Sequence, residues 1–353
     1  MKWYTTVPMV VLAVGLCTSA LAIRPYHVVG SGVSAINNIG QTATLEQTSE
    51  WDPYLYDYVY TGRAIVSGTQ GGSYNLYEGT YGVGAQICAL NDNGCVVGYT
   101  VEGYTYRGYG AYAVGPGFHR NYGYVGSQYC PDITCNAVAI NNANQALVQK
   151  LSSFVPPGPP GWEFDCTIYD ALGNQITGWM GTARATNDNG WAVGTSVEWT
   201  LQDTWPGHVW VRTETPLVYG CGQPLPDTVT TVLDINNRNH VIGDAGGHGV
   251  FLNENMVPTD LGDFEPYAIN DYDVMVGMYD GGPAICPLGG TPTLLSSLID
   301  GVYIDSAKDI NDMGWILTGN GQVLAPIPEP SSLLALGTGL VALAGMIRRR
   351  RNG

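Results

Sequence analysis

Short apolar runs, each broken by a tight polar turn, recur along the chain. In one example Ala89 and Leu90 precede Asn91-Asp92-Asn93-Gly94, and another apolar run begins at Cys95. Asn and Asp hydrogen-bond to nearby backbone in turns, and Gly adopts positive φ without steric cost. Apolar residues on both sides of such a turn predict a β-hairpin, with a type I turn followed by a bulge.

This hairpin pattern occurs seven times. The first asparagine of each copy, called the motif asparagine below, is Asn37, Asn91, Asn141, Asn187, Asn236, Asn270 or Asn311. Successive motifs are 54, 50, 46, 49, 34 and 41 residues apart, and a period of this length is typical of propeller blades or solenoid coils. The pattern predicts an all-β fold, a seven-bladed β-propeller built from repeats of about 46 residues. An open β-solenoid is the alternative, but its coils stack on a near-constant rung, which such uneven spacing does not favour.

Composition agrees with many short strands joined by turns. Gly accounts for 48 of 353 residues and charged residues for 12%, against averages of about 7% and about 25%. A helical bundle needs more Ala, Leu, Glu and Lys, and a hydrophobic content of 45% argues against disorder. The formal charge of −16 makes a nucleic-acid partner improbable.

The N-terminus has the pattern of a secretory signal peptide. Lys2 supplies a basic start, residues 7–17 are uncharged, and Ala20-Leu21-Ala22 is a small-x-small cleavage site. We therefore expect a signal peptide over residues 1–22, cleaved before Ile23, with the Sec translocon and signal peptidase as partners. An uncleaved anchor is the alternative, although the apolar run is short for a membrane span.

The C-terminus ends in a second targeting pattern. A proline-flanked motif, Pro328, Glu329 and Pro330, precedes uncharged residues 331–347 and the basic cluster Arg348, Arg349, Arg350 and Arg351. Seventeen helical residues are about 25 Å long, the low end of a membrane span. The arginines are expected to stay cytoplasmic, which leaves the body outside the cytoplasm. A permanent single-pass anchor is the alternative.

This tail resembles the PEP-CTERM sorting signal, with all three parts in order over the last 26 residues. The resemblance implies recognition by an exosortase-like membrane protease, removal of the tail, and release or attachment at the cell surface. It also implies a link to exopolysaccharide and biofilm production. The expected organisation is a signal peptide over 1–22, a propeller body over 23–327 and a sorting tail over 328–353.

The repeats also resemble the HAF family of extracellular repeats. In that family a His-Ala-Phe-like strand and an Asp-Leu-Gly segment follow the hairpin. Residues 248–252 and 260–262 fit this pattern, and residues 208–211 fit it in part. The resemblance covers roughly residues 33–324, and it implies no particular activity.

Candidate catalytic and metal-binding residues are few. The histidines His27, His119, His208, His240 and His248 have no HExxH spacing and are interpreted as strand and turn residues. Residues 91–94 and 187–190 faintly resemble calcium loops but lack the later Glu, so turn formation is favoured over calcium binding. No nucleophile elbow, phosphate-binding loop or dinucleotide fingerprint is present. The sequence therefore predicts no catalytic residue, no metal site and no cofactor, with calcium as the open alternative.

Seven cysteines remain after signal cleavage, and export permits disulfides. Cys88 and Cys95 flank a hairpin turn, and Cys130 and Cys135 enclose a short loop, so both pairs are candidate disulfides. A bond between Cys166 and Cys221 is a third possibility. Because Cys286 makes the number odd, at least one thiol is expected to stay free or to pair between chains.

Two functions remain open at this stage. The first is a non-enzymatic surface or matrix protein that contacts exopolysaccharide, and the second is a polysaccharide lyase or hydrolase on the propeller. Nine basic and 29 acidic residues lie between 23 and 327, a formal charge of −20. Such a body repels anionic polymer unless divalent cations bridge the charges, so we expect calcium to strengthen binding to acidic polysaccharide.

Overall fold

The computed structural model of the chain describes residues 26–55, 57–69, 71–79, 84–102, 108–126, 135–153, 162–204 and 207–327. Within these ranges the secondary structure is 26 β-strands and one short 3-10 helix, η1 (Leu295–Ser297). The all-β prediction is confirmed. The expected signal peptide, with Ala20 and Ala22, and the sorting tail from Pro328 onward lie outside the described residues.

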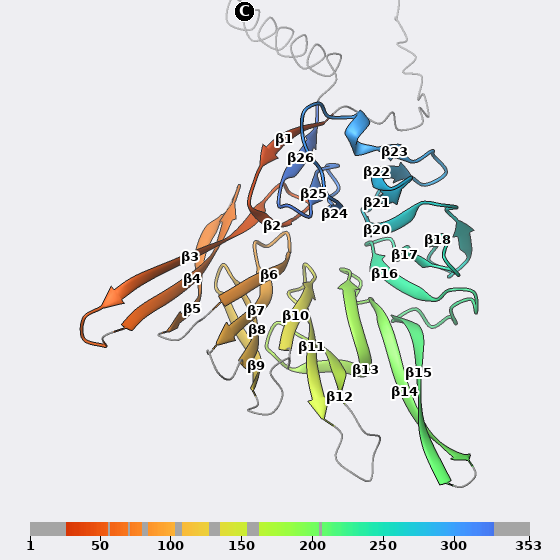
Figure 1. Ribbon diagram of the computed structural model, residues 1–353, viewed down its shortest axis with the longest axis horizontal. Coiled ribbons are helices and arrows are strands. Elements are labelled where there is room, and N and C mark those ends of the chain that lie inside the picture. The colour runs from red at the N-terminus through yellow and green to blue at the C-terminus, as the bar shows by residue number, and fades with distance from the viewer. Residues whose placement is uncertain are drawn as a thin grey trace, which may run out of the picture.

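The strands form six antiparallel sheets around a central axis, which gives a β-propeller (Figure 1). The first two sheets contain β2 (Val33–Ile36), β3 (Thr42–Asp52), β4 (Asp57–Ser67) and β5 (Gly72–Gly79), then β6 (Gly84–Leu90), β7 (Val96–Glu102), β8 (Gly108–Gly115) and β9 (Phe118–Gly126). The third contains β10 (Cys135–Ile140), β11 (Ala146–Ser153), β12 (Trp162–Tyr169), β13 (Gln175–Thr186), β14 (Ala192–Thr204) and β15 (Gly207–Tyr219).

The remaining sheets have four strands each. They contain β16 (Thr231–Ile235), β17 (Val241–Asp244), β18 (Gly249–Leu252) and β19 (Pro258–Asp260), then β20 (Glu265–Ile269), β21 (Val274–Tyr279), β22 (Gly282–Pro287) and β23 (Thr293–Leu294). The last contains β24 (Ala307–Ile310), β25 (Ile316–Thr318), β26 (Val323–Pro326) and, from the other end of the chain, β1 (Tyr26–Gly30).

The prediction of seven blades is wrong at the level of sheets, because the described strands form six. The reason is β13, which serves two neighbouring units without a loop between them. Its residues 175–180 pair with β12 and its residues 181–186 pair with β14. Gly181 lies at this changeover with φ of 140°, and a Cβ there would be 2.0 Å from the carbonyl oxygen of Thr195. The six-stranded sheet therefore carries two of the seven hairpin motifs.

Each innermost strand carries a β-bulge shortly before its motif asparagine. The register with the next strand shifts at the same place in all seven strands. The skipped residues, called the bulge residues below, are Ser34, Cys88, Val138, Arg184, Leu233, Tyr267 and Lys308. A bulge re-aims side chains that strict alternation would send elsewhere.

The hydrophobic core is divided into clusters packed around the axis. The largest contains Ile285, Leu295, Ile316 and Leu324, and it also buries Tyr26 from β1. The backbone N–H of Tyr26 donates to the carbonyl of Leu298 at 2.8 Å. The N-terminal strand therefore completes the last sheet, so that the ring closes and hides strand edges.

Two long hairpins project from the ring as arms (Figure 1). In β3 every residue from Glu46 to Trp51 is exposed, and in β14 exposure dominates beyond Val197. The edge-to-face pair of Trp51 and Tyr58, with ring centroids 5.3 Å apart, lies near the end of the first arm. The described residues contain no helix long and apolar enough to cross a membrane.

The predicted disulfide between Cys88 and Cys95 is absent, and both residues are free thiols. Cys88 is a bulge residue and lines the axial pocket described below, whereas Cys95 is buried in the hydrophobic cluster between β7 and β10. The bulge thus turns Cys88 away from its expected partner. Burial raises the pKa of both thiols to about 11, so they stay protonated at neutral pH.

The suggested bond between Cys166 and Cys221 is absent too. The two free thiols are buried in different hydrophobic clusters, and each donates to a carbonyl oxygen nearby. Cys286 is also a free thiol. Cys130 lies outside the described residues, so its pairing with Cys135 stays a prediction.

Candidate functional site

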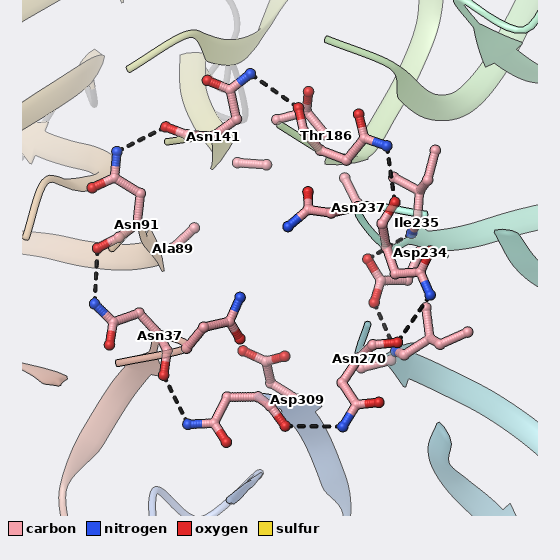
Figure 2. Close-up of a pocket in the computed structure, with 18 of the residues that line it drawn as sticks. Asn37, Ala89, Asn91, Asn141, Thr186, Asp234, Ile235, Asn237, Asn270 and Asp309 are labelled. Atoms are coloured by element: carbon pink, nitrogen blue, oxygen red, sulfur yellow. Dashed lines mark hydrogen bonds between the residues drawn. The ribbon is translucent and has the colours of Figure 1, made fainter. Parts of the chain in front are cut away.

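The seven motif asparagines form a closed hydrogen-bonded ring around the axis (Figure 2). Each Nδ2 donates to the backbone carbonyl of the next motif asparagine, at 2.7–3.0 Å. The last of these bonds joins Asn311 to Asn37, 274 residues apart, and closes the circle at 2.7 Å. All seven side chains are at most 5% exposed. This asparagine ring links all seven motifs.

The other end of each amide holds its own turn. The Oδ1 atom accepts the backbone N–H four residues later, as in the 2.9 Å bond from Cys95 to Asn91. The residue three after each motif asparagine has positive φ, as predicted where it is Gly, and Asn144 and Asn239 adopt it too. Asp273 takes this conformation in the sixth motif, with φ of 58°. One side chain therefore closes a turn and ties it to the neighbouring unit.

A second closed ring lies one residue further along each motif. Each backbone N–H donates to the side-chain Oδ1 of the equivalent residue in the next unit, at 2.7–3.0 Å. The members of this Asx ring are Asn38, Asp92, Asn142, Asp188, Asn237, Asp271 and Asp312. Asp92 and Asp188 also accept both amide protons of Asn142, each at 2.9 Å.

An odd-membered ring cannot alternate Asn and Asp throughout, and here two aspartates are neighbours. The N–H of Asp271 donates to Asp312 Oδ1 at 2.8 Å, which brings the two carboxyl groups together. Burial, and then the charge of Asp271, raise the pKa of Asp312.

The rings surround a cavity of about 330 Å³, called the axial pocket. In six motifs its wall runs from the bulge residue to the Asx-ring residue, and in the first motif it runs from Ile36 to Asn38. Because each inner strand leads into its motif asparagine, the bulge residues lie at one end of the pocket and the Asx ring at the other. We call these the bulge end and the Asx end.

Two further carboxyl groups lie between these ends. Five motifs have Ala two residues before the asparagine, but two have Asp234 and Asp309. Burial raises the pKa of Asp234 to about 7, although hydrogen bonds from the N–H groups of Ile269 and Ile235 act against the rise. Burial likewise raises the pKa of Asp309 to about 6. Both carboxyls are half-buried and part of the pocket wall.

The bulge end carries the only basic residues of the pocket wall among those the structure describes. Arg184 and Lys308 are exposed bulge residues, and Tyr267, 40% exposed, is the bulge residue of the motif next to Lys308. The second and third motifs give an apolar stretch of wall beside Arg184, with Ala89, Ala139 and Val138. The pocket is thus positively charged at one end and rich in carboxylates and amides at the other.

The structure does not bring together the metal-binding candidates of the sequence. The two calcium-like segments form ring turns, and Asp92 and Asp188 use their carboxylate oxygens as hydrogen-bond acceptors for neighbouring units. Among the described residues no group of three metal-ligating side chains converges.

The histidines do not converge either. His240 is buried, with its two ring nitrogens 2.7 Å from Asp273 and 3.1 Å from Glu254. His208 lies near the tip of an arm, 2.5 Å from Asp203. None of the five histidines is part of the axial pocket.

Sequence reasoning missed the pocket acids and bases. The available signal was the change from Ala to Asp at one fixed motif position, in Asp234 and Asp309. Arg184 and Lys308 gave no signal, because the bulge that turns them toward the axis is not visible in the sequence.

Comparison with protein families finds the PEP-CTERM protein-sorting motif over residues 326–351. This motif marks an exported protein that is sorted by an exosortase-type membrane protease, as Pro328, Glu329, Pro330 and the four arginines predicted. The likeness of the body to the HAF family stays a prediction. Comparison with curated proteins finds no match.

Proposed function

We propose that this chain is a surface or extracellular-matrix protein with a non-enzymatic binding role, linked to exopolysaccharide or biofilm. Its propeller presents a binding site, and the axial pocket is that site. The observation that carries the proposal is the combination of an exosortase sorting motif with one pocket onto which all seven motifs converge. Pockets with a few convergent polar groups are the default binding sites of folded domains.

The state of the pocket carboxylates supports binding over catalysis. The Oδ1 atoms of the ring aspartates accept backbone N–H groups, and both oxygens of Asp234 do so as well. A general acid or base needs an oxygen that is able to reach the substrate. Most carboxylates here hold the ring together instead.

An enzyme is the second candidate function, because one observation favours it. Asp234 and Asp309 have pKa values raised to about 7 and about 6, the range in which a carboxyl transfers protons at neutral pH. A polysaccharide hydrolase or lyase on this scaffold would use these two groups. Replacing Asp309 with Asn would then abolish turnover, whereas a binding protein shows no turnover to lose.

The binding role is tested on immobilised glycans with the exported protein. We expect binding to at least one acidic polysaccharide, stronger with millimolar calcium than with chelator, because the body is strongly acidic. Binding that is equally strong in chelator would argue against calcium bridging and for direct contacts. Release of shorter saccharides during the same incubation would favour the enzyme.

Sorting is tested by the intact mass of the protein in producing cells. We expect a mature form that begins near Ile23 and ends near the motif at Pro328. Replacing Pro328, Glu329 and Pro330 with alanines should leave the precursor in the inner-membrane fraction. A wild-type species that starts at Ile23 and still ends at Gly353 would contradict processing and favour a permanent anchor.

A further inference from the structure

The bulge end of the axial pocket holds an unusual share of the basic residues of this acidic chain. Seven Lys and Arg residues fall in the described ranges, and two of them, Arg184 and Lys308, line the pocket. Neither forms an ion pair with any described residue, whereas Arg212 pairs with Glu163 and Glu214. The two cations belong to the fourth and seventh motifs, so they stand on different sides of the bulge end and are suited to meet the anionic groups of a ligand that spans it.

A hydrogen-bond acceptor lies next to Lys308 in the chain. The Oδ1 atom of Asp309 accepts the N–H of Ile310 at 2.8 Å, and no described residue donates to its Oδ2. Figure 2 shows this carboxyl group directed into the pocket. Asp234 differs, because its two oxygens accept the N–H groups of Ile235 and Ile269. Of the two carboxyl groups between the ends, Asp309 is therefore the one with an oxygen left for a ligand.

The bulge end thus offers cations and a hydrogen-bond acceptor, which suits a ligand that carries both a carboxylate and hydroxyl groups. Arg184 and Lys308 are matched to a carboxylate, and Asp309 is matched to a hydrogen-bond donor. A simple anion would leave Asp309 without a donor. Tyr267 adds a partly exposed ring beside Lys308, a surface on which the apolar face of a sugar packs.

We propose that the bulge end of the axial pocket binds the uronate residues of an acidic polysaccharide. Arg184 and Lys308 contact sugar carboxylates from different sides of the bulge end, and Asp309 accepts hydrogen bonds from ring hydroxyls. This inference rests on the proposed binding function and names the class of ligand for the same pocket. The acidic Asx end lies at the far side and is closed by its own hydrogen bonds, so it does not compete for these carboxylates.

The test measures binding of the exported protein to a galacturonic acid trimer and to a galactose trimer, in chelator so that calcium cannot bridge. We expect at least a tenfold preference for the charged trimer. The double variant Arg184→Gln/Lys308→Gln should lose that preference, and Asp309→Asn should weaken binding of both trimers several-fold. Arg63→Gln, which removes an exposed charge on β4 outside the pocket, is the matched control and should change binding less than twofold. The thermal unfolding midpoint of each variant shows that the fold is kept.

Three results would overturn the inference, and they differ in what else they overturn. Trimer binding that is unaffected by the double variant would place the ligand elsewhere and leave the proposed binding function intact. Binding of free galacturonic acid or gluconate as tightly as the trimer, with the same dependence on Arg184 and Lys308, would assign the pocket to a small hydroxy acid. Absence of binding to any saccharide, charged or neutral, would contradict the proposed function itself.

Discussion

At the residue scale, the motif asparagine explains why the sequence repeats as it does. The turn-forming role of Asn was predictable, because it depends on atoms within five residues of the chain. The bond from its Nδ2 to the next unit was not predictable, because that carbonyl is 34–54 residues away in the sequence for six of the asparagines. Asp and Ser also form such turns, but an ionised Asp has no donor, and Ser has one hydroxyl oxygen for both roles. The Asn amide uses separate atoms, Oδ1 for its own turn and Nδ2 for the neighbouring carbonyl.

Replacing Asn187 with Ala should destabilise the protein by about 2–4 kcal/mol. The substitution leaves the N–H of Trp191 and the carbonyl of Asn236 without their side-chain partners, and it creates a small void. Urea unfolding followed by tryptophan fluorescence measures the change.

Asn255→Ala is the matched control, because Asn255 is exposed and bonds only to nearby residues. It should change the free energy of unfolding by less than about 0.5 kcal/mol. Equal effects at Asn187 and Asn255 would mean that the asparagine ring contributes nothing to stability.

Asp309 should make stability depend on pH. Its pKa is about 6 in the folded protein and about 3.9 in an unfolded chain, so the folded state binds the proton more tightly. This preference stabilises the fold below about pH 4 and is lost as the pH rises through about 6. Asp309→Asn keeps an oxygen for the N–H of Ile310 and removes the titration.

The free energy of unfolding of Asp309→Asn relative to wild type should therefore rise between pH 4 and pH 7, by an amount on the order of 1–2 kcal/mol. Chemical denaturation at a series of pH values measures it. Parallel pH profiles for the two proteins would show that Asp309 ionises in the fold as it does in water.

At the scale of elements, the hairpins could be predicted from the sequence, but the bulges and the division into sheets could not. The apolar–turn–apolar pattern placed a strand on each side of every motif, and the structure has both. The bulge residues were unpredictable, because a bulge adds one residue that composition does not mark, and this explains why Cys88 does not meet Cys95. The missing seventh sheet has a similar cause, since β13 crosses between two units at Gly181 and leaves no loop to signal a boundary.

The arm formed by β14 and β15 should be dispensable for folding. Beyond Val197 its residues are mostly exposed, and Trp199 and Arg212 are directly paired across the two strands. Replacing residues 200–211 with Asn-Gly, which favours a tight hairpin turn, should change the free energy of unfolding by less than about 1 kcal/mol.

The replaced segment ends at residue 211, so that Arg212 keeps its ion pair with Glu163 on β12. Thermal unfolding of the shortened protein is the measurement, with the full-length protein as reference. A loss of cooperative unfolding would show that the arm is part of the core and not an appendage.

At the scale of the whole molecule, the chain forms a closed ring of sheets and carries a sorting motif typical of exported proteins. The ring is closed by β1 on β26 and by the bond from Asn311 to Asn37. The exosortase motif lies directly after the last strand, so the closed body and the sorting tail are separate parts of the chain. The seven motifs and the sorting tail could be recognised in the sequence, because each is a local pattern. The signal peptide stays a prediction. The ligand pocket was not, because its wall is assembled from seven distant segments.

The central claim is that the exported protein binds exopolysaccharide without degrading it. The most direct measurement is size-exclusion chromatography of the purified mature protein with exopolysaccharide from its own producing cells, following protein and polymer together. We predict that the protein elutes with the polymer and that the polymer keeps its size after prolonged incubation. A polymer that becomes shorter would identify an enzyme, and a protein that elutes alone, with and without calcium, would contradict the claim.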